Sequence, residues 1–236
     1  MTNFNYSGSE LDIFSYAENW KKYWSKIVRK YLGFTVLEVG AGIGTNSKIL
    51  FNKESKRWVA LEPDKQLCKE ISKSISKDNS LRSIEVISGT IANLSVSELF
   101  DTILYIDVLE HIENDFSELI TAQSHLTLNG HIVVLAPAHN FLFTPFDKKI
   151  GHFRRYNKKM LRAITPPNCS IVDLRYIDSV GMLASLANKA FLKSDSPSLK
   201  QVLLWDKFMV RSSLLIDKLF GFLLGKTIIC VLKKND

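Results

Sequence analysis

The amino-acid sequence predicts an α/β fold in which helices cover both faces of a mostly parallel sheet. Short apolar segments rich in β-branched residues alternate with segments of helical periodicity along most of the chain, a pattern typical of parallel sheets. Three glycines follow the first apolar segment, as expected where a strand turns sharply into a helix. The 236 residues, 46% of them hydrophobic and 23% charged, suit one globular domain and exclude a disordered chain or a disulfide scaffold.

The elements follow from periodicity and from residues that begin or end helices. Aromatic and apolar residues recur at helical spacing over residues 11–31, and Gly33 ends this predicted helix. Asp64 and Asn157 are the expected N-caps of two later helices. The predicted strands span residues 35–39, 57–61, 84–87, 100–106, 131–136, 170–176 and 227–232. The remaining predicted helices span residues 46–51, 65–77, 113–128, 158–164, 183–192 and 201–224.

One long segment, residues 138–156, interrupts this alternation after the fifth strand. It is rich in histidine, aromatic and basic residues, and it is too long for an ordinary connection between a strand and a helix. We expect this segment and the N-terminal helix, about residues 11–32, to form a cap on the substrate side. No linker composition divides the chain, so residues 1–236 are expected to form a single domain.

The net charge of +7 is concentrated in one stretch. Seven of the 31 Lys and Arg residues lie between 148 and 172, where no acid occurs, which leaves 24 basic residues against 24 acidic ones. A uniformly basic surface for nucleic acid is therefore not expected. The seven basic residues are Lys148, Lys149, Arg154, Arg155, Lys158, Lys159 and Arg162.

The cysteines and the ends of the chain bear on location. Cys68, Cys169 and Cys230 are far apart in the sequence, which predicts neither a disulfide framework nor a zinc site, and no metal is expected. The sequence predicts no signal peptide and no apolar run long enough to span a membrane. These features favour a reducing cytoplasm as the location.

The glycines after the first strand are the first functional signal. Gly40, Gly42 and Gly44 occupy positions one, three and five of the turn, whereas a dinucleotide fingerprint has glycines at one, three and six. A tight turn between strand and helix is the simpler explanation of such a cluster. Glu62 ends the second strand, however, and a carboxylate there can accept both hydroxyls of a ribose.

A third motif, D-V-L-E-H-I over residues 107–112, follows the fourth strand. Together the three motifs resemble class I S-adenosylmethionine-dependent methyltransferases of the small-molecule type (type 11/12-like) over residues 36–135. The resemblance implies a Rossmann-like seven-stranded sheet with an antiparallel strand pair at its edge, S-adenosylmethionine as cofactor and S-adenosylhomocysteine as product. The implied cofactor-binding residues are Glu38, Gly40, Ala41, Gly42, Gly44, Glu62, Pro63, Thr90, Asp107 and Val108. Alternatively, Glu38 binds amides of the turn and Asp107 caps the turn after its strand.

Three histidines are candidate catalytic bases, because a base helps when the acceptor carries a proton of high pKa. His111 and His139 follow the fourth and fifth strands, and His152 lies in the long segment. For His111, a purely structural role in its turn is the alternative.

The sequence G-H-F-R-R-Y, residues 151–156, resembles a segment that lies over the active site in many small-molecule methyltransferases. The resemblance implies that His152, Arg154, Arg155 and Tyr156 contact the substrate. Arginine suits this role because its guanidinium binds carboxylate or phosphate through two parallel hydrogen bonds. In the alternative interpretation, the arginines pair internally with acids such as Asp147 or Glu110.

These features predict methyl transfer to a small molecule, at oxygen, with an anionic or a lipid- or glycan-linked acceptor. The preference for oxygen rests on the histidines and on the lack of the N/D-P-P-Y/W/F loop of base-modifying enzymes. The alternatives are an RNA methyltransferase that binds through residues 148–162 and a non-catalytic nucleotide-binding or interaction protein. The apolar stripe of residues 201–224 is expected in the core; a homodimer interface or a peripheral membrane contact is the alternative.

Overall fold

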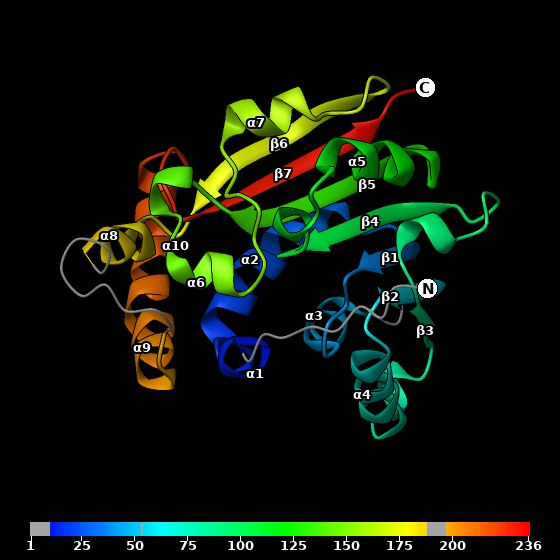
Figure 1. Ribbon diagram of the computed structural model, residues 1–236, viewed down its shortest axis with the longest axis horizontal. Helices are drawn as coiled ribbons and strands as arrows, with labels where there is room; N and C mark the ends of the chain where they lie inside the picture. Colours follow the sequence, from blue (N-terminus) through cyan, green and yellow to red (C-terminus); the bar gives the residue numbers. More distant parts are fainter. Residues whose placement is uncertain (1–9, 53, 188–196) are drawn as a thin grey trace.

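The computed structural model describes residues 10–52, 54–187 and 197–236. Its strands are β1 (Thr35–Val39), β2 (Arg57–Glu62), β3 (Ile84–Ser88), β4 (Phe100–Ile106), β5 (Leu126–Pro137), β6 (Cys169–Ile177) and β7 (Thr227–Lys234). They form one seven-stranded sheet in the order β3-β2-β1-β4-β5-β7-β6 (Figure 1). Neighbours are parallel except at β7, which is antiparallel to both β5 and β6. The predicted α/β class and the antiparallel pair at the edge are confirmed.

The helices are α1 (Glu10–Ser15), α2 (Glu18–Val28), α3 (Thr45–Leu50), α4 (Lys65–Ser76), α5 (Asp115–Ser124), α6 (Pro145–Lys149), α7 (Lys158–Ala163), α8 (Ser179–Ala187), α9 (Leu199–Leu204) and α10 (Arg211–Leu219). Val36 of β1 packs into the core beneath α2, α3 and α4. Its neighbour Leu37 packs into a second core beneath α5 and α7. Because both faces of the sheet are covered, its strands read as nearly continuous apolar runs.

The helix predicted over residues 11–31 is broken in two at Tyr16 and Ala17. Ala17 occupies the N-cap of α2, and its side chain cannot accept a hydrogen bond. The Asp206 carboxylate serves as the cap in place of an N-cap side chain. It accepts hydrogen bonds from the backbone amides of Asn19 and Trp20 at 3.1 and 2.8 Å. The break depends on a cap supplied from a distant part of the chain, which local periodicity cannot predict.

The helix predicted over residues 201–224 is also divided. A π-helical turn, Trp205–Val210, separates α9 from α10, and the helix ends at Leu219 because Gly221 and Phe222 adopt positive φ angles of 60° and 59°. The expected helix 183–192 begins earlier, as α8 at Ser179. Its later part lies outside the described residues.

The helix predicted over residues 113–128 is shorter, because β5 begins at Leu126 rather than at residue 131. Leu126 pairs with Phe100, and the register between β4 and β5 then shifts before the pair Thr102–His131. The other expected helix starts are confirmed: Asp64 accepts amides of α4, and Asn157 accepts the Met160 amide of α7.

Candidate cofactor and acceptor site

The glycine turn after β1 lies at the carboxyl end of the parallel strands. Gly40, Gly42 and Gly44 have φ angles of 65°, 58° and 75°, a region that residues with a Cβ rarely adopt. A Cβ on Gly40 would lie 2.7 Å from a methyl carbon of Val108, in the turn after β4. Conformation and packing thus both require glycine at position 40. The turn after β1 and the turn after β4 therefore touch each other. Gly40 and Val108 are both predicted to bind the cofactor, and such a shared role needs the two turns to be close.

Glu62 fixes this turn from the end of β2. Its Oε2 accepts the Gly42 amide at 2.8 Å and its Oε1 accepts the Asp64 amide at 3.0 Å. Burial raises the pKa of the Glu62 carboxyl, and the two amides partly offset this effect. Each oxygen accepts one amide and retains a further acceptor position. A nucleoside whose ribose hydroxyls donate to these positions would therefore fit beside the turn.

Glu38 lies deeper in the same region and is 1% exposed. Its Oε2 accepts the Ser47 hydroxyl at 2.5 Å and the Trp58 indole at 3.3 Å. The Ser47 backbone also bonds to this carboxyl, at the start of α3, so the amide it binds belongs to the helix rather than to the glycine turn. Burial raises the pKa of Glu38 to about 7. Its Oε1 is buried and has no hydrogen-bond partner among the described residues.

Asp107 follows β4 with a φ of 55°, a strained value for a residue with a side chain. It does not cap the next turn, the 3₁₀ turn Leu109–His111, whose N-cap residue Val108 makes no capping bond. Asp107 reaches solvent, yet the surrounding protein atoms raise the pKa of its carboxyl to about 6. Cofactor contact by Asp107 remains a prediction from the resemblance.

The remaining cofactor candidates make local bonds. The Ala41 amide donates to the Leu61 carbonyl, which ties the turn after β1 to β2, and Pro63 follows Glu62 directly. The Thr90 amide and hydroxyl both bond to Asn93 Oδ1, at the start of a 3₁₀ turn. Cofactor contact by Thr90 therefore remains a prediction from the resemblance.

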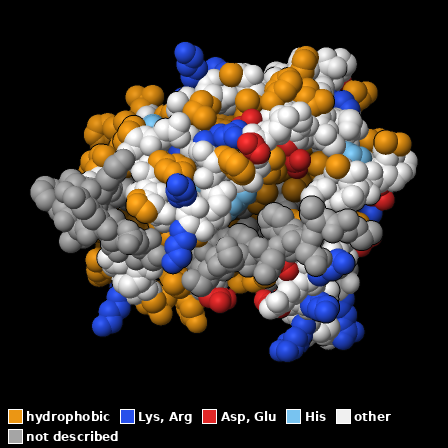
Figure 2. Space-filling view, viewed as in Figure 1, with side chains coloured by type: hydrophobic (Ala, Val, Ile, Leu, Met, Phe, Trp, Pro, Cys, Tyr) orange, Lys and Arg blue, Asp and Glu red, His pale blue; other side chains and the backbone are white. Residues whose placement is uncertain are grey.

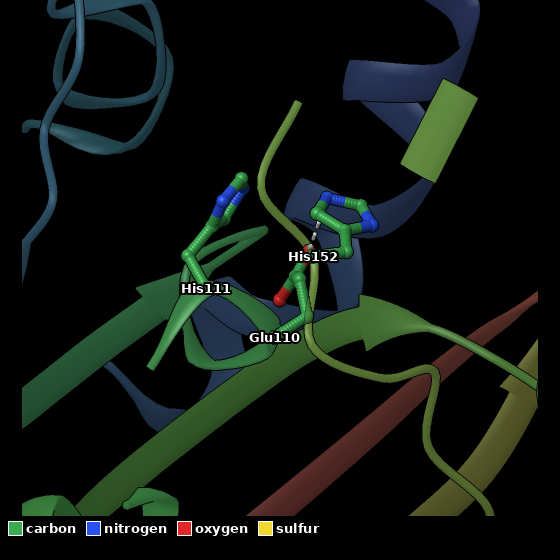
Figure 3. Close-up of side chains that lie close together, drawn as sticks. All are labelled: Glu110, His111 and His152. Atoms are coloured by element: carbon green, nitrogen blue, oxygen red, sulfur yellow. Dashed lines mark ion pairs between the residues drawn. The ribbon is translucent and has the colours of Figure 1, made fainter. Parts of the chain in front are cut away.

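Two of the three candidate catalytic histidines come together. Glu110 and His111 project from the turn after β4, and His152 projects toward them from the segment after α6 (Figure 3). The His111 and His152 ring centroids are 4.5 Å apart, and His152 Nε2 lies 3.8 Å from Glu110 Oε1. Burial, then the neighbouring His152, lowers the pKa of His111 to about 4. Figure 2 shows this face of the molecule hollowed near its middle, with acidic and histidine side chains beside the hollow.

Asp147 organises the segment that carries His152. It is 1% exposed, and its carboxylate accepts two hydrogen bonds from Arg155, at 2.8 and 2.9 Å. The Thr144 amide and hydroxyl also donate to it, at 2.8 and 2.7 Å, and Thr144 is the N-cap residue of α6. His152 Nδ1 lies 3.0 Å from Asp147 Oδ1. These partners hold the pKa of Asp147 well below its usual range despite burial.

Arg154 and Tyr156 form a second internal contact. Arg154 pairs with Asp115 at 2.5 Å, and the Tyr156 hydroxyl donates to the same carboxylate at 2.8 Å. Tyr156 is fully buried. Together with the Arg155–Asp147 pair, this geometry favours the internal interpretation of the two arginines over the predicted substrate contact.

His139, the third candidate base, lies apart from the cluster. Its ring packs on Phe141 and Tyr176, with centroids 4.9 and 4.5 Å away, and its φ is 66°. Burial lowers the pKa of His139. Lys226 is a further residue near the site that the sequence did not predict. It is partly exposed, its Nζ lies 3.5 Å from Asp178, and its charge lowers the pKa of Asp107. No local motif marks it.

Comparison with known proteins agrees with this geometry. Residues 36–130 match the family model of a methyltransferase domain, whereas no curated protein sequence matches the chain. The N-methyltransferase NodS of Bradyrhizobium japonicum, solved with S-adenosylhomocysteine, superposes with a TM-score of 0.62 over 98% of this chain and 94% of its own, at 13% identity.

Two further solved structures share the fold. Coclaurine N-methyltransferase gives a TM-score of 0.63 at 16% identity, over 92% of this chain and 72% of its own. The [4+2]-cyclase SpnF gives 0.63 at 11% identity, over 97% and 94%. At such identities the superpositions establish the fold, and the match over residues 36–130 carries the assignment of activity. Residues 36–130 therefore match a methyltransferase domain, and the fold that the chain shares with these solved structures extends beyond them.

Proposed function

We propose that the chain methylates a hydroxyl oxygen of a small molecule held between Asp107 and the acid–histidine cluster, Glu110, His111 and His152. One observation carries this proposal: two segments meet in the cluster. Glu110 and His111 lie in the turn after β4, three and four residues after Asp107, and His152 comes from the segment after α6. Ligands of open α/β sheets bind at this edge. A hydroxyl must lose its proton as it is methylated, and imidazole and carboxylate groups are suited to receive it.

The cofactor side of the site is assigned to the glycine turn and to Glu62. S-adenosylmethionine, when bound, supplies the methyl group: the acceptor oxygen bonds to the methyl carbon, the carbon–sulfur bond breaks and its electron pair stays on sulfur. Glu62 would accept the ribose hydroxyls while it holds the Gly42 amide. Asp107, in the turn beside Gly40, would face the amino-acid end. The protein's contribution is chiefly alignment of the two reactants.

An anionic group on the acceptor would meet lysine rather than arginine. Arg154 and Arg155 are engaged with buried acids, so the pair proposed from the sequence is already neutralised. Lys148 and Lys149 of α6 are exposed and carry no ion pair among the described contacts. They are therefore the residues that we assign to a carboxylate or phosphate of the acceptor.

Nitrogen is the second candidate acceptor atom, because two of the solved structures with this fold are named N-methyltransferases. A neutral amine attacks without losing a proton first, so it gains less from a nearby base than a hydroxyl does. The buried cluster thus favours oxygen.

Paired acceptors test the reaction. We expect the full chain with S-adenosylmethionine to methylate phenolic or aliphatic hydroxyl compounds and to leave their amino counterparts unchanged. The reason is that the proposed site holds a hydroxyl beside the cluster, where its proton can be removed. Mass spectrometry would detect the added methyl group and locate it. Methylation of the amines alone would contradict the assignment to oxygen.

A lipid-linked acceptor is supported by the surface formed by α9, the π-helical turn and α10. Its two acids, Asp206 and Asp217, are buried, whereas Lys200, Lys207 and Arg211 reach solvent. No helix among the described residues is long and apolar enough to cross a membrane. Large apolar side chains are at least 40% exposed at Leu199, Leu203, Leu204, Phe208, Leu215 and Leu219. Apolar and basic groups on one surface favour contact with an anionic bilayer.

Flotation tests this contact. The chain should float with vesicles that contain anionic lipid and stay behind with vesicles of neutral lipid, because both lysines and apolar side chains are needed. Replacing Leu215 and Leu219 with serine should abolish flotation, whereas the same change at exposed Val96 and Leu128 should leave it intact. Flotation that survives the first pair of changes would exclude this surface.

A further inference from the structure

The Glu110 carboxyl lies in a position that is costly for an isolated acid. It is 0% exposed, and neither of its oxygens has a hydrogen-bond partner on another described residue. Burying a carboxylate without a partner is strongly unfavourable. It is therefore either protonated or paired with a positive charge.

Two imidazoles face the same point. One ligand-type atom from each of Glu110, His111 and His152 can be chosen so that all three lie within 4.8 Å of one another, and Figure 3 shows the three side chains converging. Two imidazole nitrogens and one carboxylate oxygen form a set that binds divalent transition metals.

The surroundings of both histidines resemble those of metal ligands. A metal-bound histidine usually directs its second ring nitrogen to a carboxylate or a backbone carbonyl, which fixes the ring. His152 directs Nδ1 to Asp147 and leaves Nε2 toward Glu110. The His111 ring is hydrogen-bonded to the backbone of Gly151. Asp147 is in turn fixed by Arg155 and Thr144.

We propose that Glu110, His111 and His152 bind one divalent transition-metal ion of the zinc, iron or cobalt class. Three protein ligands leave at least one coordination position open. If the proposed function holds, on which this role of the ion depends, the acceptor oxygen would take that position and the ion would lower the pKa of its hydroxyl. The proton would then pass to water, and the three side chains would serve as ligands rather than as the base. A metal at this place also supplies the positive charge that the Glu110 carboxylate lacks.

Metal binding is measured without reference to activity. The full chain is stripped with a chelator, dialysed against Zn²⁺ alone or Co²⁺ alone, and analysed for bound metal by mass spectrometry. We expect one equivalent per chain, and visible absorption bands of bound Co²⁺. Glu110→Gln should lose the bound metal, and Asp147→Asn should weaken it by about 10- to 100-fold, the usual effect of removing a residue that orients a ligand.

A matched control and a folding measurement keep the result clear. His131→Gln replaces a histidine in the middle of β5, whose ring lies 5.6 Å from that of Tyr31 in a tilted arrangement, and should bind metal like the unaltered chain. Binding of S-adenosylhomocysteine by Glu110→Gln would show that the variant is folded. Equal Zn²⁺ binding by the Glu110→Gln protein, or none by the unaltered chain, would overturn the metal site. Methylation of amines alone, with Zn²⁺ bound, would instead refute the proposed acceptor and leave the metal site standing.

Discussion

Replacing Glu62 with alanine should weaken binding of S-adenosylhomocysteine by at least about 100-fold, which corresponds to about 3 kcal/mol. Two losses combine. The carboxylate holds the Gly42 and Asp64 amides, so its removal releases the glycine turn that adjoins the cofactor. Its remaining acceptor positions are those that we assign to the ribose hydroxyls, and hydrogen bonds to a charged group each contribute about 1.5–3 kcal/mol. Titration calorimetry with the full chain measures the change directly.

The control is Glu85→Ala, on the neighbouring strand β3. Glu85 is exposed and pairs with Arg57 on the surface, so its loss should leave the dissociation constant unchanged. Circular dichroism would establish that the Glu62→Ala protein is folded. A folded variant that binds S-adenosylhomocysteine as tightly as the unaltered chain would refute the cofactor site.

The strands could be predicted because most are apolar runs bounded by glycine, proline or charge, and each of the seven predicted ranges overlaps a strand of the structure. The start of β5 could not, because Asn129–Gly130 is a typical turn signal. In the structure, Asn129 adopts a φ of 62° within an irregular part of the strand. The break between α1 and α2 escaped prediction for a different reason. Its cap, Asp206, is brought in by tertiary packing.

The site shows the same limit. Sequence motifs place His111 and His152 near one edge of the sheet, because His111 follows the fourth strand and His152 lies in the long segment after the fifth. They do not fix which arginine pairs with which acid. That choice depends on the capping of α6 by Thr144, which positions Asp147 between His152 and Arg155. Backbone pairing of Ala138 with Tyr156 then returns the segment to the sheet.

Asp147→Asn should reduce kcat by at least about 100-fold, equivalent to about 3 kcal/mol of lost transition-state stabilisation, with little change in binding of S-adenosylhomocysteine. The asparagine side chain offers one acceptor oxygen where the carboxylate serves His152, Arg155 and Thr144. The His152 ring then loses its fixed orientation, and Arg155, which is partly buried, loses its ion pair with Asp147. Breaking a buried pair in this way costs about 3–5 kcal/mol of stability, so the assay belongs below the lowered melting temperature.

Asp115→Asn separates loss of stability from loss of orientation. It breaks a comparable pair, with Arg154, and leaves one amide oxygen in place of the carboxylate that accepts the Tyr156 hydroxyl. Asp115 has no hydrogen bond or ion pair to His152 among the described contacts. The two variants should therefore lose similar stability, measured by thermal unfolding, whereas kcat should fall far more for Asp147→Asn. If kcat fell equally in both, stability alone would account for the loss, and Asp147 would have no part in orienting His152 toward Glu110.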